Sequence, residues 1–410
     1  MTMTNKEIKK YLDSAPTRYD DSAFLSFIEK VGMPVLPRTI HITGTNGKGS
    51  SARYLALSLE KSGYQVGLFT SPHYLKINEL ATINGVEIPD EFILGKMHRF
   101  DNDFKTFELS SFEIMTFISF LYFSEKNVDF VIVEVGLGGL KDATNIVSPI
   151  LSIITNVGLD HINEIGPTIE DIARHKAGII KSDTPLLIGD IKDSALSIIE
   201  DVAKRKNAEV ISTNFSYEIL HKSLTATKFH YLGKDYFLGS GAAYEVKNAI
   251  LVINALEILK AMNIKINDNA LEAALLEETF PGRFSVVSIN PAIVVDGAHN
   301  THAFVSLLND LKVTKKKITV IFAAFKDKDF EKELDLLSLS GARIMLTTFD
   351  HPRAVKTFNN SLPFYPSHQE AIERAITSLG PEDLLLIVGS LHFAMQVTLE
   401  FRGGVYETRA

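Results

Sequence analysis

The sequence contains no cysteine among its 410 residues. This absence excludes disulfide bonds and thiolate metal sites, and it fits a reducing compartment. No apolar run approaches the roughly 18 residues that a membrane-spanning helix needs. The first residues, Met1-Thr-Met-Thr-Asn-Lys6, lack the apolar core of a signal peptide. We therefore expect a cytoplasmic protein with no membrane partner.

The sequence also lacks an excess of positive charge, because its formal net charge at pH 7 is -8. Nothing global therefore favours nucleic acid or an anionic membrane as a partner. Any phosphate-binding site must be local, built from backbone N–H groups and a few placed cations. Hydrophobic residues make up 45% of the chain and charged residues 22%, which is typical of a soluble globular protein.

Continuous apolar segments alternate with helical segments after two short amphipathic helices expected within residues 5–30. The expected apolar strands cover residues 38–43, 66–70, 129–135 and 150–155. Strands that are apolar on both faces are typical of a parallel sheet covered by helices, so this order predicts such a sheet. Residues 229–238 have the pattern of a hairpin, which predicts a small antiparallel patch.

A second alternating series begins near Ala292. Its expected strands cover residues 292–295, 318–323, 343–348 and 384–388. Proline and glycine interrupt the pattern at Phe280-Pro-Gly-Arg283, which places a boundary there. The predicted fold is therefore α/β, with a larger N-terminal P-loop domain over residues 1–280 that includes the antiparallel patch. A smaller, Rossmann-like C-terminal domain is expected over residues 281–410.

The segment His41-Ile-Thr-Gly-Thr-Asn-Gly-Lys-Gly-Ser50 follows the first expected strand and leads into a helix expected up to about residue 61. Glycines let successive N–H groups point inward and a helix N-terminus adds positive potential, so this context suits a phosphate. The strict P-loop pattern is not met, because Ile42 replaces its first glycine and Gly49 follows Lys48. The alternative is a glycine-rich turn with a surface lysine; the agreement of loop, lysine, hydroxyl and flanking elements favours a phosphate loop.

Three polar residues stand at or just past the ends of expected strands, where open α/β sheets bind ligands: Ser71, Glu134 and His161. A carboxylate inside an apolar strand is costly unless a cation or several donors meet it. Magnesium prefers oxygen ligands and keeps several waters. Taken singly, these residues have simpler interpretations as a turn serine, a structural ion pair and a core histidine; taken together they indicate a metal site.

The motifs in which these residues lie resemble those of the folylpolyglutamate synthase and dihydrofolate synthase family, a branch of the Mur ligase superfamily. The resemblance covers nearly the whole chain. Its motifs are HITGTNGKGS (41–50), SPHYLKINE (71–79), VEVGLGG (133–139), DATN (142–145), TNVGLDH (155–161), KAGIIK (176–181), PGRF (281–284), DGAHN (296–300) and GSLHF (389–393).

The resemblance implies a role for each matching residue. ATP phosphates would be held by Thr45, Asn46, Gly47, Lys48, Gly49 and Ser50. Two magnesium ions would be coordinated by Ser71, Glu134 and His161, and Lys176 would match the lysine that carbon dioxide converts to a carbamate. The nucleotide or the transferring phosphoryl group would be reached by Asn248, Arg283, Asp296 and His299. Lys48, Lys176 and His299 form the expected catalytic set.

The implied reaction joins L-glutamate to a folate. A carboxylate attacks the γ-phosphate of ATP to give an acyl phosphate, and an amine then displaces the phosphate. The implied partners are therefore folate and L-glutamate, with neither nucleic acid nor membrane. The resemblance also implies a monomer, the usual oligomeric state in the family.

Two positions depart from the family pattern on the acceptor side. Leu80 and Leu140 stand where the family usually has arginine, although Lys141 follows Leu140 and Lys76 is close in sequence. Arginine and leucine are not interchangeable in carboxylate recognition. The departures indicate either drift, with a lysine taking over the cationic role, or a changed acceptor.

Four functions remain open from the sequence. The first is folylpolyglutamate synthase. The second is dihydrofolate synthase, alone or together with the first activity. The third is a Mur-type ligase with another carboxylate acceptor, and the fourth is a binding protein on a ligase scaffold. Glu134, His161 and Lys176 argue against the fourth, because binding alone does not need a carbamate lysine.

Overall fold

The structure, a computed structural model, describes residues 5–16, 21–73, 76–277, 281–312, 314–328 and 330–406. The chain forms two compact units, which are described separately. Unit 1 comprises Met1–Phe215 and Lys247–Ala274, and unit 2 comprises Ser216–Val246 and Leu275–Ala410. The division falls within helix α9 (Ala243–Ala261).

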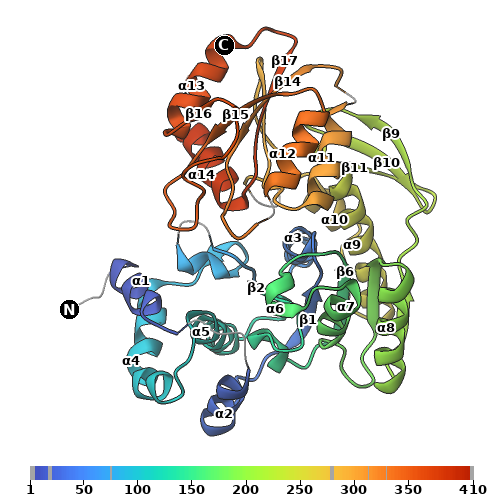
Figure 1. Cartoon of the computed structure of the whole chain (residues 1–410). Coiled ribbons are helices and arrows are strands. Elements are labelled where there is room, and N and C mark those ends of the chain that lie inside the picture. Colours follow the sequence, from blue (N-terminus) through green and yellow to red (C-terminus); the bar gives the residue numbers. More distant parts are fainter. Residues whose placement is uncertain are drawn as a thin grey trace. The chain divides into compact units, whose positions relative to one another are not determined.

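Unit 1 is built on an eight-stranded sheet in the order β4-β3-β2-β5-β1-β6-β7-β8. The strands are β1 (Arg38–Thr43), β2 (Val66–Phe69), β3 (Ala81–Ile83), β4 (Val86–Glu87), β5 (Phe130–Glu134), β6 (Leu151–Asn156), β7 (Leu186–Asp190) and β8 (Val210–Ser212). The six strands from β2 to β8 in this order are parallel, and only β3 and β4 pair antiparallel. The carboxyl ends of β2, β5, β1 and β6 therefore share one edge (Figure 1).

Helices cover this sheet because its strands are apolar on both faces. They are α1 (Asn5–Asp13), α2 (Ser22–Val31), α3 (Lys48–Lys61), α4 (Asp90–Thr106), α5 (Ser111–Glu125), α6 (Ile162–Ile165), α7 (Ile169–Ala177), α8 (Asp193–Arg205), α9 and α10 (Ala270–Leu275). Two short 3-10 helices, η1 (Ile77–Leu80) and η2 (Ala143–Ile146), lie in loops. Val131 and Val133 of β5 belong to a core cluster with residues of α4 and α5, whereas Ile154 of β6 belongs to a cluster with residues of α7 and α8.

The start of α7 is defined by a side-chain cap, and this helix carries one of the predicted site residues. The Thr168 hydroxyl oxygen accepts a hydrogen bond from the Asp171 N–H at 3.1 Å. Such a cap satisfies one of the free N–H groups of the first turn and typically contributes about 1 kcal/mol. Glu170 and Asp171 add negative charge at the positive end of the helix dipole.

Unit 2 contains a six-stranded sheet in the order β12-β13-β17-β14-β15-β16, parallel except for β12. Its strands are β12 (Ser285–Ile289), β13 (Ala292–Val295), β14 (Lys317–Phe322), β15 (Arg343–Thr347), β16 (Phe364–Tyr365) and β17 (Asp383–Val388). Its helices are α11 (Thr301–Lys312), α12 (Phe330–Leu339), α13 (His368–Ser378) and α14 (Leu391–Arg402). Alternate strand residues pack with α11 and α12 on one face and with α13 and α14 on the other.

A three-stranded antiparallel sheet also belongs to unit 2, with β9 (Glu218–Lys222), β10 (Thr227–Tyr231) and β11 (Lys234–Leu238) in the order β11-β10-β9. A buried ion pair holds it to α11, because Lys222 Nζ lies 2.6 Å from Asp310 Oδ1. The second carboxylate oxygen of Asp310 accepts from the Ala243 N–H at 2.8 Å. The segment before α9 is thereby tied to the fold of unit 2.

The predicted α/β class, the mostly parallel sheet and the hairpin at 229–238 are confirmed. The expected strands occur within one or two residues of their predicted bounds. Strands β3, β4, β7, β8, β9, β12 and β16 were not predicted. The boundary at 280/281 stays a prediction, and Phe280 lies outside the described residues. None of the helices in the described ranges is long and apolar enough to cross a membrane.

Candidate functional site

The predicted phosphate loop occupies the shared edge of unit 1's sheet. It leaves β1 at Thr43 and enters α3 at Lys48. Ser71 follows β2, Glu134 ends β5 and Asn156 ends β6, and the sheet order β2-β5-β1-β6 places these three strand ends beside the end of β1. Parallel strands bring residues far apart in sequence to one edge, the usual place for ligands in open α/β sheets.

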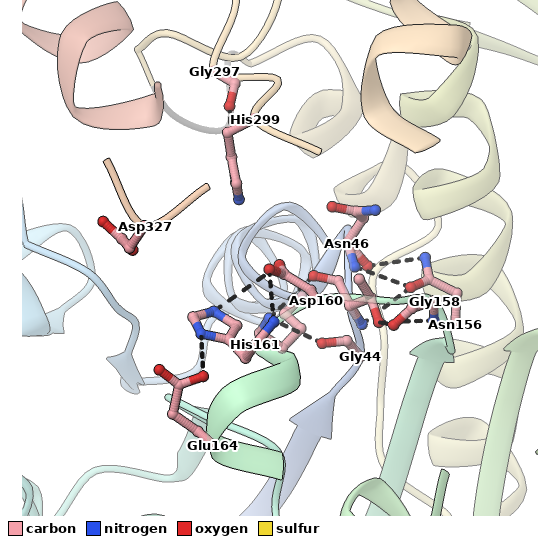
Figure 2. A network of polar contacts seen from close by, with 12 residues as sticks. Gly44, Asn46, Asn156, Gly158, Asp160, His161, Glu164, Gly297, His299 and Asp327 are labelled. Carbon is pink, nitrogen blue, oxygen red and sulfur yellow. Dashed lines mark hydrogen bonds and ion pairs between the residues drawn. The ribbon is translucent and has the colours of Figure 1, made fainter. Parts of the chain in front are cut away.

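The first half of the loop is bonded to the end of β6 (Figure 2). The N–H groups of Thr45 and Asn46 both donate to Asn156 Oδ1, at 3.1 and 2.9 Å. Asn156 Nδ2 donates back to the Asn46 carbonyl at 3.1 Å. One carboxamide therefore satisfies three backbone groups of the loop. Asn156 lies in the TNVGLDH motif, but no role was predicted for it.

Two further residues complete this connection. The Thr155 hydroxyl donates to the Asn46 carbonyl at 2.6 Å. The Thr45 hydroxyl donates to the Gly158 carbonyl at 3.0 Å and accepts from the Gly158 N–H at 2.9 Å. The loop after β1 and the loop after β6 are thus held together by reciprocal hydrogen bonds.

Gly47 marks the turn from the loop into α3. Its φ of 80° lies in the left-handed region, which glycine adopts at little cost. A Cβ on Gly47 would overlap the carboxamide of Asn248, which lies on α9. The predicted residue Asn248 is therefore placed directly beside the phosphate loop, within unit 1.

Lys48 and Ser50 lie in the first turn of α3. Lys48 Nζ donates to the Gly44 carbonyl at 2.9 Å and to the Thr45 carbonyl at 3.3 Å, so the ammonium group lies over its own loop. Gly49 and Ser50 are buried beside it, with Ser50 only 1% exposed. The N-terminus of α3 thus presents helix N–H groups and one ammonium group, a combination that suits phosphate.

Two of the predicted metal ligands are in contact. Glu134 is only 3% exposed, and its Oε2 accepts a hydrogen bond from the Ser71 N–H at 3.1 Å. A buried carboxylate at a strand end costs free energy unless donors or a cation meet it. Tyr74 and Leu75, from the motif that begins at Ser71, lie outside the described residues.

The third predicted ligand, His161, begins α6 with a φ of 52° and a side chain that is 44% exposed. Its ring nitrogens lie 4.0 Å from an Asp160 oxygen and 3.9 Å from a Glu164 oxygen (Figure 2). Within the described ranges, no three histidine, aspartate or glutamate side chains gather as a metal-binding group. One buried carboxylate, one hydroxyl and an accessible imidazole suit a cation that takes its remaining oxygens from phosphate and water.

Lys176 lies in the last turn of α7 and is only 3% exposed. Burial lowers the pKa of its ammonium group well below the usual range, and the positive charge of Lys48 lowers it further, whereas Asp160 opposes both. The backbone here is fixed from outside the helix, since the Leu140 N–H donates to the His175 carbonyl at 2.8 Å. The structure therefore brings Lys176 close to the phosphate-loop lysine, which its position in the sequence did not indicate.

The two leucines that depart from the family pattern have different surroundings. Leu80 is 3% exposed and belongs to the hydrophobic core cluster that contains Phe69 and Ile88. Leu140 is 46% exposed, although its backbone packs against Gly178. Leu80 therefore has a packing role in this chain, and Leu140 alone is presented to solvent.

In unit 2, Asp296 follows β13 and is the centre of a buried polar group. Its carboxylate accepts from the Tyr244 hydroxyl at 2.7 Å, the Phe284 N–H at 2.8 Å and the Ala298 N–H at 2.8 Å. Burial raises the pKa of Asp296, while these hydrogen bonds and the charge of Arg283 oppose the increase. Burial also raises the pKa of Tyr244 well above its usual range, with Asp296 adding to the effect. Sequence reasoning missed Tyr244, which carried no motif signal.

Arg283 and His299 are close in the chain to residues of this group. Arg283 directly precedes Phe284, and its charge acts on both Asp296 and Tyr244. The Nδ1 atom of His299 lies 2.8 Å from the Gly297 carbonyl. Because a carbonyl can only accept, Nδ1 carries a proton, and Nε2 is the acceptor in the neutral ring.

Two family models match this chain. The Mur ligase middle domain matches residues 42–256, and the glutamate ligase domain of Mur ligases matches residues 282–391. The first match covers more than half of the chain and includes the phosphate loop, Glu134, His161 and Lys176.

Individual relatives match over nearly the full length. A dihydrofolate synthase/folylpolyglutamate synthase of Bacillus subtilis is 34% identical over 386 residues, covering 88% of this chain and 89% of that protein. The folylpolyglutamate synthase of Lacticaseibacillus casei is 30% identical, covering 98% of this chain and 100% of its own. A crystal structure of a bifunctional folylpolyglutamate synthase/dihydrofolate synthase with Mn, AMPPNP and L-glutamate bound is 26% identical, with a TM-score of 0.83 and 98% coverage of both chains.

Proposed function

The chain belongs to the folylpolyglutamate synthase and dihydrofolate synthase family of Mur ligases, and from this premise we propose that it joins L-glutamate to a tetrahydrofolate. It is an ATP-dependent ligase of this type. The observation that carries the proposal is the buried Lys176, held close to Lys48 beside a loop shaped for phosphate. A surface with only a binding function has no need of a buried lysine at that position.

The chain's own residues have distinct tasks in the proposed reaction. Lys48, with the α3 N-terminus, offsets negative charge that develops on the phosphoryl oxygens when a folate carboxylate attacks the γ-phosphate. Ser71, Glu134 and His161 are the proposed ligands of magnesium, at two sites, and the metal supplies further charge neutralisation when bound. We propose that Gly47, Gly49, Ser50 and Asn248 contact the nucleotide in unit 1, and that Thr45 and Asn46 complete the nucleotide site as the first half of its loop.

Lys176 is proposed to react with carbon dioxide. Its lowered pKa keeps a fraction of the amine neutral, and a neutral amine is the form that adds to carbon dioxide. The nitrogen–carbon bond forms as one carbon–oxygen π bond of carbon dioxide opens, one proton leaves the nitrogen, and the neutral amine becomes an anionic carbamate. A carbamate there would supply oxygen to a cation that also uses Glu134 and His161.

Residues of unit 2 complete the proposal. Arg283, Asp296 and His299 are proposed to contact the nucleotide or the transferring phosphoryl group, as the family motifs imply. The hydrogen bonds on Asp296 and the fixed tautomer of His299 support defined positions for both side chains. The proposed domains are residues 1–280 and 281–410. We propose a cytoplasmic monomer, and light scattering on the purified protein tests the oligomeric state by measuring its molar mass.

A second activity is favoured by one observation. The Bacillus subtilis relative carries the names of both enzymes and is 34% identical over 386 residues. Dihydrofolate synthase activity, in which dihydropteroate replaces tetrahydrofolate, is therefore the second candidate. A different carboxylate acceptor is less supported, because Leu80 is part of the hydrophobic core.

ADP release with a panel of acceptors tests the proposal. Dihydropteroate, tetrahydrofolate and methylenetetrahydrofolate are each supplied with L-glutamate, ATP and magnesium. Release with a tetrahydrofolate supports the first activity, and release with dihydropteroate supports the second. A protein that binds ATP but releases no ADP with any folate would defeat both.

A further inference from the structure

The hydrogen bonds of Asn156 determine which groups of the phosphate loop are available to a nucleotide. Both N–H groups in the first half of the loop, on Thr45 and Asn46, point to Asn156 Oδ1. The Thr45 N–H is also 3.2 Å from the Asn156 carbonyl. A side-chain oxygen thus occupies the place where a phosphate oxygen is expected in a glycine-rich loop.

We propose that Asn156 is a positioning residue that fixes the first half of the loop, so that phosphate is bound by the second half, Gly47–Ser50, and the α3 N-terminus. This inference rests on the proposed function. Thr155 acts with Asn156, because its hydroxyl donates to the Asn46 carbonyl at 2.6 Å. Hydrogen bonds among five residues, Thr45, Asn46, Thr155, Asn156 and Gly158, thus form a clasp at the end of β6, the β6 clasp.

The geometry gives the β6 clasp a second consequence. Thr45 is bonded in both directions to Gly158, three residues before the proposed metal ligand His161. The loop that holds phosphate and the loop that carries His161 are therefore joined at their bases. A fixed separation between phosphate and metal ligand lowers the entropy cost of assembling the site.

The alternative is that Asn156 only stabilises the fold. The two roles predict different effects of its substitution on stability, KM values and nucleotide affinity. A structural role lowers the thermal midpoint and affects the KM values of all substrates alike. A positioning role weakens nucleotide binding selectively. Loss of two to three hydrogen bonds to the loop, at about 1 kcal/mol for each bond, corresponds to an affinity about 30- to 140-fold lower.

The experiment compares Asn156→Ala with Asn207→Ala in the full chain. Asn207 is a matched control, because it lies in unit 1 and its side-chain amide donates to the exposed carboxylate of Asp183 at 2.7 Å. The dissociation constant of AMPPNP with magnesium is measured by calorimetry, and KM values for ATP and glutamate are measured by ADP release. We expect Asn156→Ala to raise the AMPPNP dissociation constant and the ATP KM at least tenfold, with the glutamate KM unchanged.

Thr155→Val is the second variant. Thr155 is only 5% exposed, and valine keeps the volume of its side chain while removing the hydroxyl that bonds the Asn46 carbonyl. It should raise the AMPPNP dissociation constant about three- to tenfold. Wild-type affinity in either folded variant would overturn the role of the clasp, as would a parallel rise in all KM values. Failure of the wild-type protein itself to bind AMPPNP would instead overturn the proposed function.

Discussion

Lys176 is buried, and both its burial and the positive charge of Lys48 lower the pKa of its ammonium group. The positive charge of Lys48 and the burial of Lys176 both disfavour the ammonium form of Lys176, so its neutral or chemically modified form is favoured relative to that of an exposed lysine. The residue is therefore suited to a reaction that an exposed lysine undergoes poorly at neutral pH.

The first prediction concerns carbon dioxide. Turnover of the wild-type enzyme should fall severalfold after exhaustive removal of carbon dioxide and return when bicarbonate is added, because the carbamate is lost and reformed. Lys176→Ala should be inactive at every bicarbonate concentration. ADP release at controlled carbon dioxide concentrations measures turnover of the wild type and of Lys176→Ala, and 13C NMR detects the carbamate carbon. A turnover rate that does not depend on carbon dioxide, together with no carbamate signal, would argue against the modification.

The second prediction separates the two leucines. Leu80→Arg places a charge in the apolar core and should lower the free energy of unfolding by about 3 kcal/mol. Leu140→Arg changes a half-exposed position and should alter that free energy by no more than about 0.5 kcal/mol. Urea denaturation followed by circular dichroism compares them, and equal losses in both variants would contradict the assigned surroundings.

At the scale of elements, the main strands and the parallel class of the sheets were predictable, because strands covered on both faces are continuous apolar segments in the sequence. The order of the strands within each sheet was not predicted. The short strands β3, β4 and β16 were missed because two or three residues carry too little pattern. Strand β12 was missed because its residues alternate weakly and it joins the sheet antiparallel. Local patterns do not encode such edge positions.

The site was predictable only in part, for a related reason. Motif residues such as Lys48 and Glu134 were found from strand ends and glycine spacing. Asn156 and Tyr244 act through partners about 110 and 52 residues away, and nothing in their local sequence marks those contacts. The closeness of Lys176 to Lys48 also depends on tertiary structure.

The third prediction concerns the link between α11 and the three-stranded sheet. Asp310→Ala leaves Lys222 buried without its ion-pair partner and should cost about 3–5 kcal/mol of unfolding free energy. Asp235→Ala is the control, because Lys228–Asp235 is a partly exposed pair in the same unit and should change stability by at most about 1 kcal/mol. Urea denaturation measures both, and a loss no larger than that of the control would remove the structural role of the pair.

The fourth prediction concerns the pair α13 and α14. Burial raises the pKa of Glu400, but hydrogen bonds from His368, Tyr406 and Gln396 outweigh it, so the pKa lies below its ordinary value. A lowered carboxyl pKa adds stability above the unfolded-state pKa, and this stability is lost as the pH falls through the folded-state pKa.

Glu400→Gln should therefore destabilise the protein more at pH 7 than at pH 4. The difference in unfolding free energy between wild type and variant should shrink steadily across that interval. Chemical denaturation at a series of pH values provides the measurement. A difference that stays constant with pH would show that Glu400 contributes through packing alone.

At the scale of the whole molecule, nucleotide binding should be visible as stability. A ligand that binds only the folded state at one hundred times its dissociation constant adds about 2.7 kcal/mol. AMPPNP with magnesium should raise the thermal midpoint of the wild-type protein by a few degrees. Lys48→Ala should fold normally, show little such increase and release no ADP, as followed by scanning fluorimetry and the ADP assay. A wild-type response in that variant would remove Lys48 from the phosphate site.

The hydrogen bonds between Thr45 and Gly158 join positions 113 residues apart in the chain. During synthesis the phosphate loop leaves the ribosome long before the strand that fixes it, so the loop remains incomplete until β6 has been made and paired. A nascent chain that ends before residue 158 should fail to retain nucleotide, although every residue of the loop itself is present. ATP capture by this protein must therefore wait until β6 has paired with β1, although β7 and β8 are still to be added to the sheet.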